Sequence, residues 1–226
     1  EKQMKILLLN PNSSELVTDA LRQAVEPLQT TTFRIDVKHC DNTPKGIVSC
    51  FDELKASVEV INFLLEAGAD YDGAIIGCFA DPGLRAAREM IRIPVTGLYE
   101  SSSVFAKLQG RRYSIIASGN EADISPWIGS IRDLGDMDQV ASIRYMNSTV
   151  EDAVHASDDE ICELIRICRK EDGADAVILG CAAFAGRGRR LSELAGISVI
   201  DGIEESVLLT KMLTEYGGGK SCITKN

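Results

Sequence analysis

The chain has 226 residues, 45% of them hydrophobic and 26% charged, which is the composition of a globular protein long enough to bury its own core. Its formal net charge of −10 argues against a nucleic-acid partner or an anionic membrane surface, because either would need a basic patch. No apolar run approaches the roughly 20 residues that span a bilayer, and no charged segment with an apolar core opens the chain, so we expect a soluble cytoplasmic protein that binds small molecules.

The first half of the chain alternates strands with helices. The apolar run "ILLL", bounded by Asn-Pro-Asn, predicts a buried parallel strand, and Ser13 or Ser14 can cap the helix that follows. Three further strands are predicted at "FRIDVKHC", "YDGAIIGC" and "IPVTGLYES". Helices are expected from about Asp52 to Ala67 and over "DPGLRAAREMI", where Asp81 and Pro82 mark the start. The apolar faces of the first two helices are predicted at Leu16, Ala20, Ala24 and Leu28, and at Leu54, Val58, Ile61 and Leu65.

The second half repeats this alternation. Strands are predicted at "RRYSIIASGN", "SIRYMN", "DAVILGC" and "ISVIDGIEES". A helix capped by Ser157 or Asp158 should cover "DDEICELIRICRKEDG", and a last helix should run from Val207 to Tyr216. Strands that alternate with helices are typical of an α/β protein with parallel sheets.

The two halves also resemble each other in sequence. "GADYDGAIIGC" and "GADAVILGC" share Gly-Ala-Asp, an apolar strand and a Gly-Cys pair, and "GLYES" and "GIEES" close the two repeats. Two related lobes are the simplest explanation. We expect residues 1–100 with part of 201–226 to form the first lobe and residues 101–200 the second, with a cleft between them.

Cys78 and Cys181 each follow an apolar strand. Ligands of open α/β sheets bind outside the carboxyl ends of the strands, so both thiols are candidates for a site. If a pseudo-twofold axis relates the lobes, the thiols reach a shared cleft from opposite sides, as a two-base reaction requires. Cys78 precedes the Asp81-Pro82 helix start by three residues, which predicts a pKa below the ~8.5 of a free cysteine. The small residues after Cys181 let backbone amides approach an enolate oxygen.

Other interpretations of these cysteines stay open. A cysteine at a strand end is ordinarily packed in the core, and only the matched positions of the pair favour a site. The seven cysteines show no close metal-type spacing and only two histidines are present, so we expect reduced thiols and no metal. The remaining cysteines have no equivalent in the other half: Cys40, Cys50, Cys162, Cys168 and Cys222.

The loop after the first strand carries a second group of candidates. Asn10, Asn12, Ser13 and Ser14 offer amides and hydroxyls, beside the free amides of a helix N-terminus, that can hold a carbonyl or a carboxylate. The same residues are also suited simply to shape a turn and cap a helix. The loop should share the cleft edge with Cys78, which favours a role in binding.

Five motifs occur in order along nearly the whole chain: "ILLLNPNSS", "TPKGIVS", "CFADPGL", "EDGADAVILGCA" and "VIDGIEES". In these motifs the chain resembles the hydantoin racemase and allantoin racemase group of the aspartate/glutamate racemase superfamily, which includes fungal proteins of the Dcg type. The resemblance implies two pseudo-symmetric flavodoxin-like α/β lobes with an interlobe cleft. It also implies racemisation by Cys78 and Cys181 without a cofactor or a metal, and a homo-oligomer, since symmetric assembly is common for such proteins. The substrate-binding residues would be Asn10, Ser13, Gly46, Ile47, Phe79, Ala80, Ser118, Ala182 and Ala183.

This resemblance makes racemisation at C5 of a 5-substituted hydantoin, with allantoin as one example, the leading hypothesis. That carbon lies beside a ring carbonyl, so its anion is delocalised, and two thiols with several amides suffice. An amino-acid racemase is disfavoured because the loop "ASGNEAD" lacks the Thr-rich stretch of those enzymes, and a malonate-type decarboxylase because it needs only one acid. A maleate-type isomerase and a non-catalytic metabolite-binding protein stay open.

Overall fold

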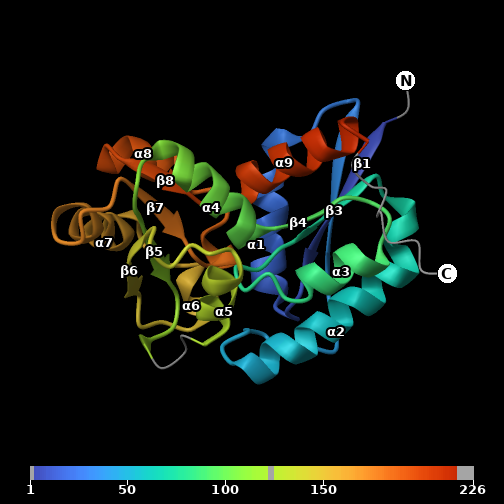
Figure 1. Cartoon of the computed structure of the whole chain (residues 1–226), viewed down its shortest axis with the longest axis horizontal. Coiled ribbons are helices and arrows are strands. Elements are labelled where there is room, and N and C mark those ends of the chain that lie inside the picture. The colour runs from blue at the N-terminus through green and yellow to red at the C-terminus, as the bar shows by residue number, and fades with distance from the viewer. Residues whose placement is uncertain (1–2, 122–124, 218–226) are drawn as a thin grey trace.

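Two parallel sheets of four strands each form the framework of the molecule (Figure 1). The computed structural model describes residues 3–121 and 125–217, so Cys222 lies outside the described residues. The strand orders are β2-β1-β3-β4 and β6-β5-β7-β8, and these strands all pair in parallel. The same order therefore occurs in both halves, and it is the order in which flavodoxin-like sheets begin. The predicted α/β class with two pseudo-symmetric lobes is confirmed, whereas the predicted lobe boundaries stay a prediction.

The elements follow one another with short connections. The first sheet contains β1 (Met4–Asn10), β2 (Phe33–His39), β3 (Gly73–Ile76) and β4 (Val95–Gly97). The second contains β5 (Tyr113–Ala117), β6 (Val140–Tyr145), β7 (Ala176–Leu179) and β8 (Ser198–Ile200). The helices are α1 (Glu15–Val25), α2 (Cys50–Ala67), α3 (Leu84–Met90), α4 (Leu98–Gln109), α5 (Ser125–Asp133), α6 (Val150–Ala153), α7 (Asp158–Lys170), α8 (Gly188–Ala195) and α9 (Ile203–Glu215). Short 3-10 turns occur at η1 (Glu26–Leu28), η2 (Gly68–Asp70) and η4 (Ala182–Phe184).

The caps predicted for two helices are observed. Ser14 precedes α1, and its hydroxyl accepts a hydrogen bond from the Val17 amide. Ser157 precedes α7 and forms a capping box, in which its hydroxyl accepts from the Glu160 amide and the Glu160 carboxylate accepts from the Ser157 amide. Each cap satisfies amides that have no acceptor inside the helix, which fixes where the helix begins.

The predicted apolar face of α1 is wrong by one residue. The buried side chains are Val17, Leu21 and Val25, whereas Leu16, Ala20 and Ala24 are partly exposed. Both sets repeat every four residues, so the spacing does not reveal which set packs on the sheet. The predicted Leu28 lies beyond the end of the helix, in η1 after Pro27.

The predicted apolar face of α2 is also wrong. The helix buries Ala56, Val60 and Leu64. Of the predicted face, Leu54, Val58 and Leu65 are 67%, 57% and 52% exposed. The small side chain of Ala56 and the slim side chain of Val60 let the helix lie close to its neighbours, so α2 is apolar on two sides and only one of them enters the core.

Two strand predictions run on too far, and each hides the start of a helix. β4 ends at Gly97 and β8 at Ile200, so α4 was not predicted and α9 begins at Ile203 instead of Val207. These two helices cross between the lobes. α4 follows the first sheet but contacts β7 and β8 of the second, whereas α9 follows the second sheet but contacts β3 and β4 of the first (Figure 1).

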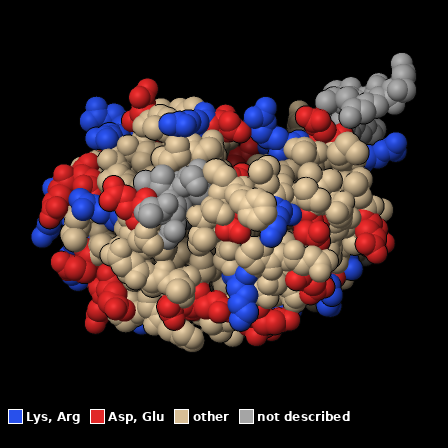
Figure 2. All heavy atoms as spheres, turned by 90° about the horizontal axis from the view of Figure 1, so that it is seen from below, with Lys and Arg blue, Asp and Glu red and all other residues tan. Residues whose placement is uncertain are grey.

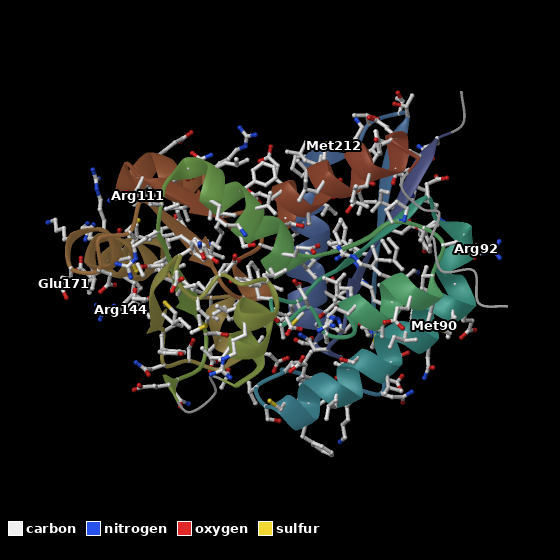
Figure 3. The ribbon with its side chains drawn as sticks, in the orientation of Figure 1. Met90, Arg92, Arg111, Arg144, Glu171 and Met212 are labelled. Atoms are coloured by element: carbon white, nitrogen blue, oxygen red, sulfur yellow. The ribbon has the colours of Figure 1, made fainter. Side chains whose placement is uncertain are left out.

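The outer strand β6 pairs in parallel with β5 and is also held to the second lobe by charged contacts. Arg144 lies beside Glu171 (Figure 3), with 3.8 Å between the guanidinium and the carboxylate. Its guanidinium also binds both carboxylate oxygens of Asp172, at 3.0 and 2.6 Å. Asp172 accepts a further hydrogen bond from Ser142 of the same strand. The bidentate pair fixes the position of a strand whose side chains are only partly buried.

Charges of both signs are interspersed on the lower face of the molecule (Figure 2). On the described part of the lower face, Lys and Arg are interspersed with Asp and Glu and form no continuous basic patch (Figure 2). Within residues 3–121 and 125–217, no helix has the length and apolar character needed to cross a membrane.

Candidate active site

Cys78 and Cys181 line one cavity, with a volume of about 40 Å³. Each follows its strand after a single glycine, Gly77 after β3 and Gly180 after β7. The amides of both glycines continue the sheet hydrogen bonds, Gly77 to the Leu9 carbonyl at 2.8 Å and Gly180 to the Ile116 carbonyl at 2.7 Å. The two thiols therefore stand at equivalent points, at the carboxyl ends of the central strands of the two sheets.

Most of the predicted site residues surround this cavity. Residues from the first lobe form one side of the wall and residues from the second lobe form the other, as expected for a site between two related sheets. The lining is mainly apolar, with the side chains of Asn12 and Ser118 as polar groups beside the thiols. The cavity is lined by Asn12, Ile47, Val48, Gly77, Cys78, Phe79, Ala80, Ser118, Val150, Gly180, Cys181 and Ala182.

Asn10 lies behind the cavity and supports Asn12, which does line it. Asn10 is fully buried, and its side-chain amide nitrogen donates to the side-chain oxygen of Asn12 and to the Thr18 hydroxyl, both at 3.0 Å. The side-chain oxygen of Asn10 accepts from the backbone amide of Asn12 at 3.2 Å. These bonds fix the loop after β1, so Asn10 orients Asn12 and lies outside the lining of the cavity.

Three other predicted binding residues also lie outside the lining. The Ser13 hydroxyl donates to the Thr43 carbonyl at 2.7 Å, which ties the β1–α1 loop to the β2–α2 loop. Gly46 packs against Val150, because a Cβ there would lie 3.1 Å from a Val150 methyl group. Ala183 is 3% exposed, and its amide forms a hydrogen bond with the thiol of Cys181.

The environment of Cys78 differs from the one expected. Burial is the main cause that raises the pKa of the Cys78 thiol to about 12. The Ala80 amide opposes this rise, and the nearby Cys181, Asp81 and Glu53 add to it. The expected lowering by a helix start at Asp81 is wrong, because α3 begins only at Leu84. Asp81 has a φ of 46° and lies in a turn, so no helix terminus faces Cys78 at that point.

Cys181 has more donors around its sulfur. Burial raises the pKa of the Cys181 thiol, while the Ser118 hydroxyl and the Ala183 amide lower it by hydrogen bonding. The carboxylates of Asp81 and Glu53, by contrast, raise the pKa of Cys78. The two thiols thus combine a protonated resting state with hydrogen-bond donors that would stabilise a thiolate once it forms.

Two residues of the lining had no place in the sequence prediction. Val48 closes the cavity from the β2–α2 loop and lies inside the motif "TPKGIVS", so that motif did point to it. Val150 closes the cavity from the start of α6 in the second lobe, and nothing in its local sequence marks it. Among the residues that the structure describes, no group of three or more His, Cys, Asp and Glu is arranged to hold a metal ion.

Comparison with known proteins finds relatives that match nearly the whole chain. A family described as Asp/Glu/Hydantoin racemase matches residues 6–210. A hydantoin racemase of Paenarthrobacter aurescens is 30% identical over 224 residues, covering 95% of this chain and 92% of the relative. The structure of an allantoin racemase from Klebsiella pneumoniae superimposes with a TM-score of 0.91 at 26% identity, covering 97% of this chain and 91% of that one. A maleate isomerase from Pseudomonas putida S16, at 14% identity and a TM-score of 0.72 over 97% of this chain and 98% of that one, shares the fold.

Proposed function

Because the chain belongs to the Asp/Glu/hydantoin racemase family, and is therefore an isomerase, we propose that it inverts C5 of a 5-substituted hydantoin such as allantoin. The observation that carries this proposal is the pair of thiols: Cys78 and Cys181 come from the two lobes and line the same cavity. Two acid-base groups on opposite sides of one carbon are what inversion by proton transfer requires.

The proposed reaction uses one thiol as a base and the other as an acid. The thiolate of one cysteine takes the proton from C5, and the electron pair left on the carbon delocalises onto the adjacent ring carbonyl as an enolate. The thiol of the other cysteine then gives its proton to the opposite face of C5, which restores the neutral ring with inverted configuration. The reverse reaction exchanges the two roles, so the same site acts on both enantiomers.

The lining of the cavity favours an uncharged ring over a free amino acid. None of the residues that line it is Lys or Arg. A free α-carboxylate buried without a cation or several donors would carry a large desolvation cost. A hydantoin is neutral, and its carbonyls and ring amides need only a few hydrogen bonds. The side-chain amide of Asn12 can donate to a ring carbonyl, and the Ser118 hydroxyl oxygen can accept from a ring N–H.

The test follows the C5 proton. We expect wild-type protein to racemise hydantoins or allantoin and to exchange the C5 hydrogen in heavy water, measured by loss of optical rotation and by NMR. Cys78→Ser and Cys181→Ser should each lower the racemisation rate by about a thousandfold or more, because a hydroxyl is a far weaker acid than a thiol. Cys50→Ser is the matched control, since Cys50 is exposed and does not line the cavity.

Two outcomes would contradict the proposal. Undiminished inversion by either cavity variant would remove that cysteine from the mechanism. Tight ligand binding by wild-type protein without any C5 exchange would instead favour the non-catalytic binding protein.

A further inference from the structure

The partly buried carboxylate of Asp81 follows Cys78 in the chain and binds the start of α4, the helix that packs on the sheet of the second lobe. The Asp81 amide donates to the Cys78 carbonyl at 3.0 Å, which closes the turn after the thiol. The Asp81 carboxylate accepts from the amides of Tyr99 at 3.1 Å and Glu100 at 2.9 Å, in the first turn of α4. Those amides have no acceptor within the helix, and their hydrogen bonds lower the pKa of Asp81, which burial raises to about 8.

Gly97 shows how closely this contact is built. A Cβ at Gly97 would lie 2.2 Å from the Asp81 carboxyl carbon, so any side chain at this position would displace the carboxylate. Asp81 itself holds a φ of 46°, which is uncommon for a residue with a side chain. Both features show that the turn is shaped to bring this carboxylate to α4.

The second lobe contains a corresponding connection between its thiol loop and the helix that crosses to the other lobe, but here the carboxylate precedes the helix. Asp201 is 6% exposed and accepts from the amides of Gly188 at 2.8 Å and Ile203 at 3.0 Å. Gly188 opens α8, at the end of the loop that begins with Cys181, and Ile203 opens α9. In the first lobe the carboxylate stands on the thiol loop and reaches the helix, whereas in the second it stands before the helix and reaches the thiol loop.

The crossing of α4 and α9 gives these contacts their importance. Asp81 ties the Cys78 loop to α4, which packs on β7 and β8 of the sheet that carries Cys181. Asp201 ties the Cys181 loop to α9, which packs on β3 and β4 of the sheet that carries Cys78. Each thiol loop is thus fastened to the opposite sheet through one carboxylate and one helix.

We propose that Asp81 and Asp201 are positioning residues that hold the two thiols at the separation needed for proton transfer across one carbon. The role in catalysis rests on the proposed racemase function, but the effect on the thiols themselves does not. Misplacement of a reacting group by about 1 Å costs on the order of a hundredfold in rate, so loss of either carboxylate should lower racemisation strongly.

The test measures the reactivity of each cysteine separately. Folded Asp81→Asn and Asp201→Asn proteins are treated with iodoacetamide, and the alkylation rate at every thiol is read by mass spectrometry of peptides. We expect Asp81→Asn to speed alkylation of Cys78 about tenfold and to leave Cys181 within about twofold, because only the Cys78 loop loosens. Asp201→Asn should show the reverse, and kcat/KM for racemisation should fall about tenfold to a hundredfold in both.

Gly97→Ala separates the position of the carboxyl group from its removal. This variant keeps the Asp81 carboxyl group but displaces it, so it should reproduce the selective alkylation of Cys78 and the loss of racemisation with the ionisable group still present. Gly129→Ala is the matched control, because a Cβ at Gly129 meets nothing within 4 Å. It should leave both thiols and the racemisation rate unchanged.

The buried thiols of Cys40, Cys162 and Cys168 report on the fold in the same experiment. If they become reactive together with Cys78 and Cys181, the carboxylates only stabilise the whole protein, and the positioning role is wrong. Unchanged alkylation of Cys78 and Cys181 would overturn it as well. Selective alkylation in a protein whose wild type racemises no hydantoin would support the positioning and contradict the proposed function.

Discussion

Cys78 and Cys181 lie in the wall of a small apolar cavity, and burial is the largest influence on the protonation of both. A buried thiol is held in its neutral form and therefore carries a proton to donate, although its raised pKa makes it a weaker acid. It becomes a good base only after ionisation, which the amides of Ala80 and Ala183 and the hydroxyl of Ser118 assist. The site is therefore suited to a cycle in which the pair holds one proton fewer than its resting state.

The pH dependence of the free enzyme follows from this protonation. Burial raises the pKa of Cys78 to about 12, so Cys78 is a neutral thiol at neutral pH, and each increase in pH increases the thiolate fraction. We expect kcat/KM to rise about tenfold per pH unit between roughly pH 6 and 8, because one thiolate is needed as the base. Initial rates of optical-rotation loss at low substrate concentration measure this slope, and a plateau within that range would show that a thiolate is already present.

At the scale of elements, Glu151 joins the two lobes beside the part of the cavity wall that Val150 forms. This residue lies in the first turn of α6, next to Val150, which lines the cavity. Its carboxylate accepts from the Ser14 hydroxyl at 2.8 Å and lies 3.5 Å from the Lys45 ammonium. Ser14 also caps α1, so one serine links the second lobe to the loop that carries Asn12.

Glu151→Ala should weaken this contact between the lobes beside Val150 without touching the reacting groups. We expect KM to rise about threefold to tenfold while kcat changes less than about twofold. The reason is that the lost contact positions the cavity wall, which holds the substrate equally in the ground and transition states. Lys45→Ala is the control: the Lys45 side chain is 71% exposed, and an exposed ion pair contributes little. A fall in kcat at constant KM would assign Glu151 to the chemical step instead.

The strands and the two thiols were predictable because their information is local. An apolar run followed by Gly-Cys marks a strand end whichever lobe it belongs to, and parallel sheets bind ligands at that end. The faces of α1 and α2 were not predictable, since each helix offers two apolar stripes and only the packed sheet selects one. Val150 and the Asp81 contact with α4 depend on segments far apart in the chain, so no local pattern announces them.

At the scale of the whole molecule, the exchange of α4 and α9 makes the two lobes one packed body. The two helices also contact each other. Buried Tyr99 on α4 ties this helix to the second lobe, because its hydroxyl lies 2.8 Å from that of Tyr113 on β5 and donates to Asp136 at 3.3 Å. A motion that separates the lobes would have to break both crossings, which favours a site that opens through its loops.

The exposed apolar stripe of α2 is a candidate contact surface for the expected homo-oligomer, which stays a prediction. Phe51, Leu54, Val58 and Leu65 are 65%, 67%, 57% and 52% exposed, and with Ile61 they recur at spacings of three and four residues along the helix. This is the spacing of a helix-pairing seam, and a stripe of this kind on α2 is suited to bind the same stripe of a second copy. α2 lies along the lower edge of the molecule in Figure 1.

Leu54→Glu should therefore reduce self-association, because it places a charge in the middle of an apolar contact that must lose water on assembly. We expect wild-type protein at micromolar concentration to have a mass of two or more chains by light scattering, and Leu54→Glu to shift toward the mass of one. Leu208→Glu is the control, since Leu208 is 49% exposed on α9, outside this stripe. A wild-type mass of one chain would contradict the oligomer, and an oligomer that Leu54→Glu leaves intact would place its interface on another face.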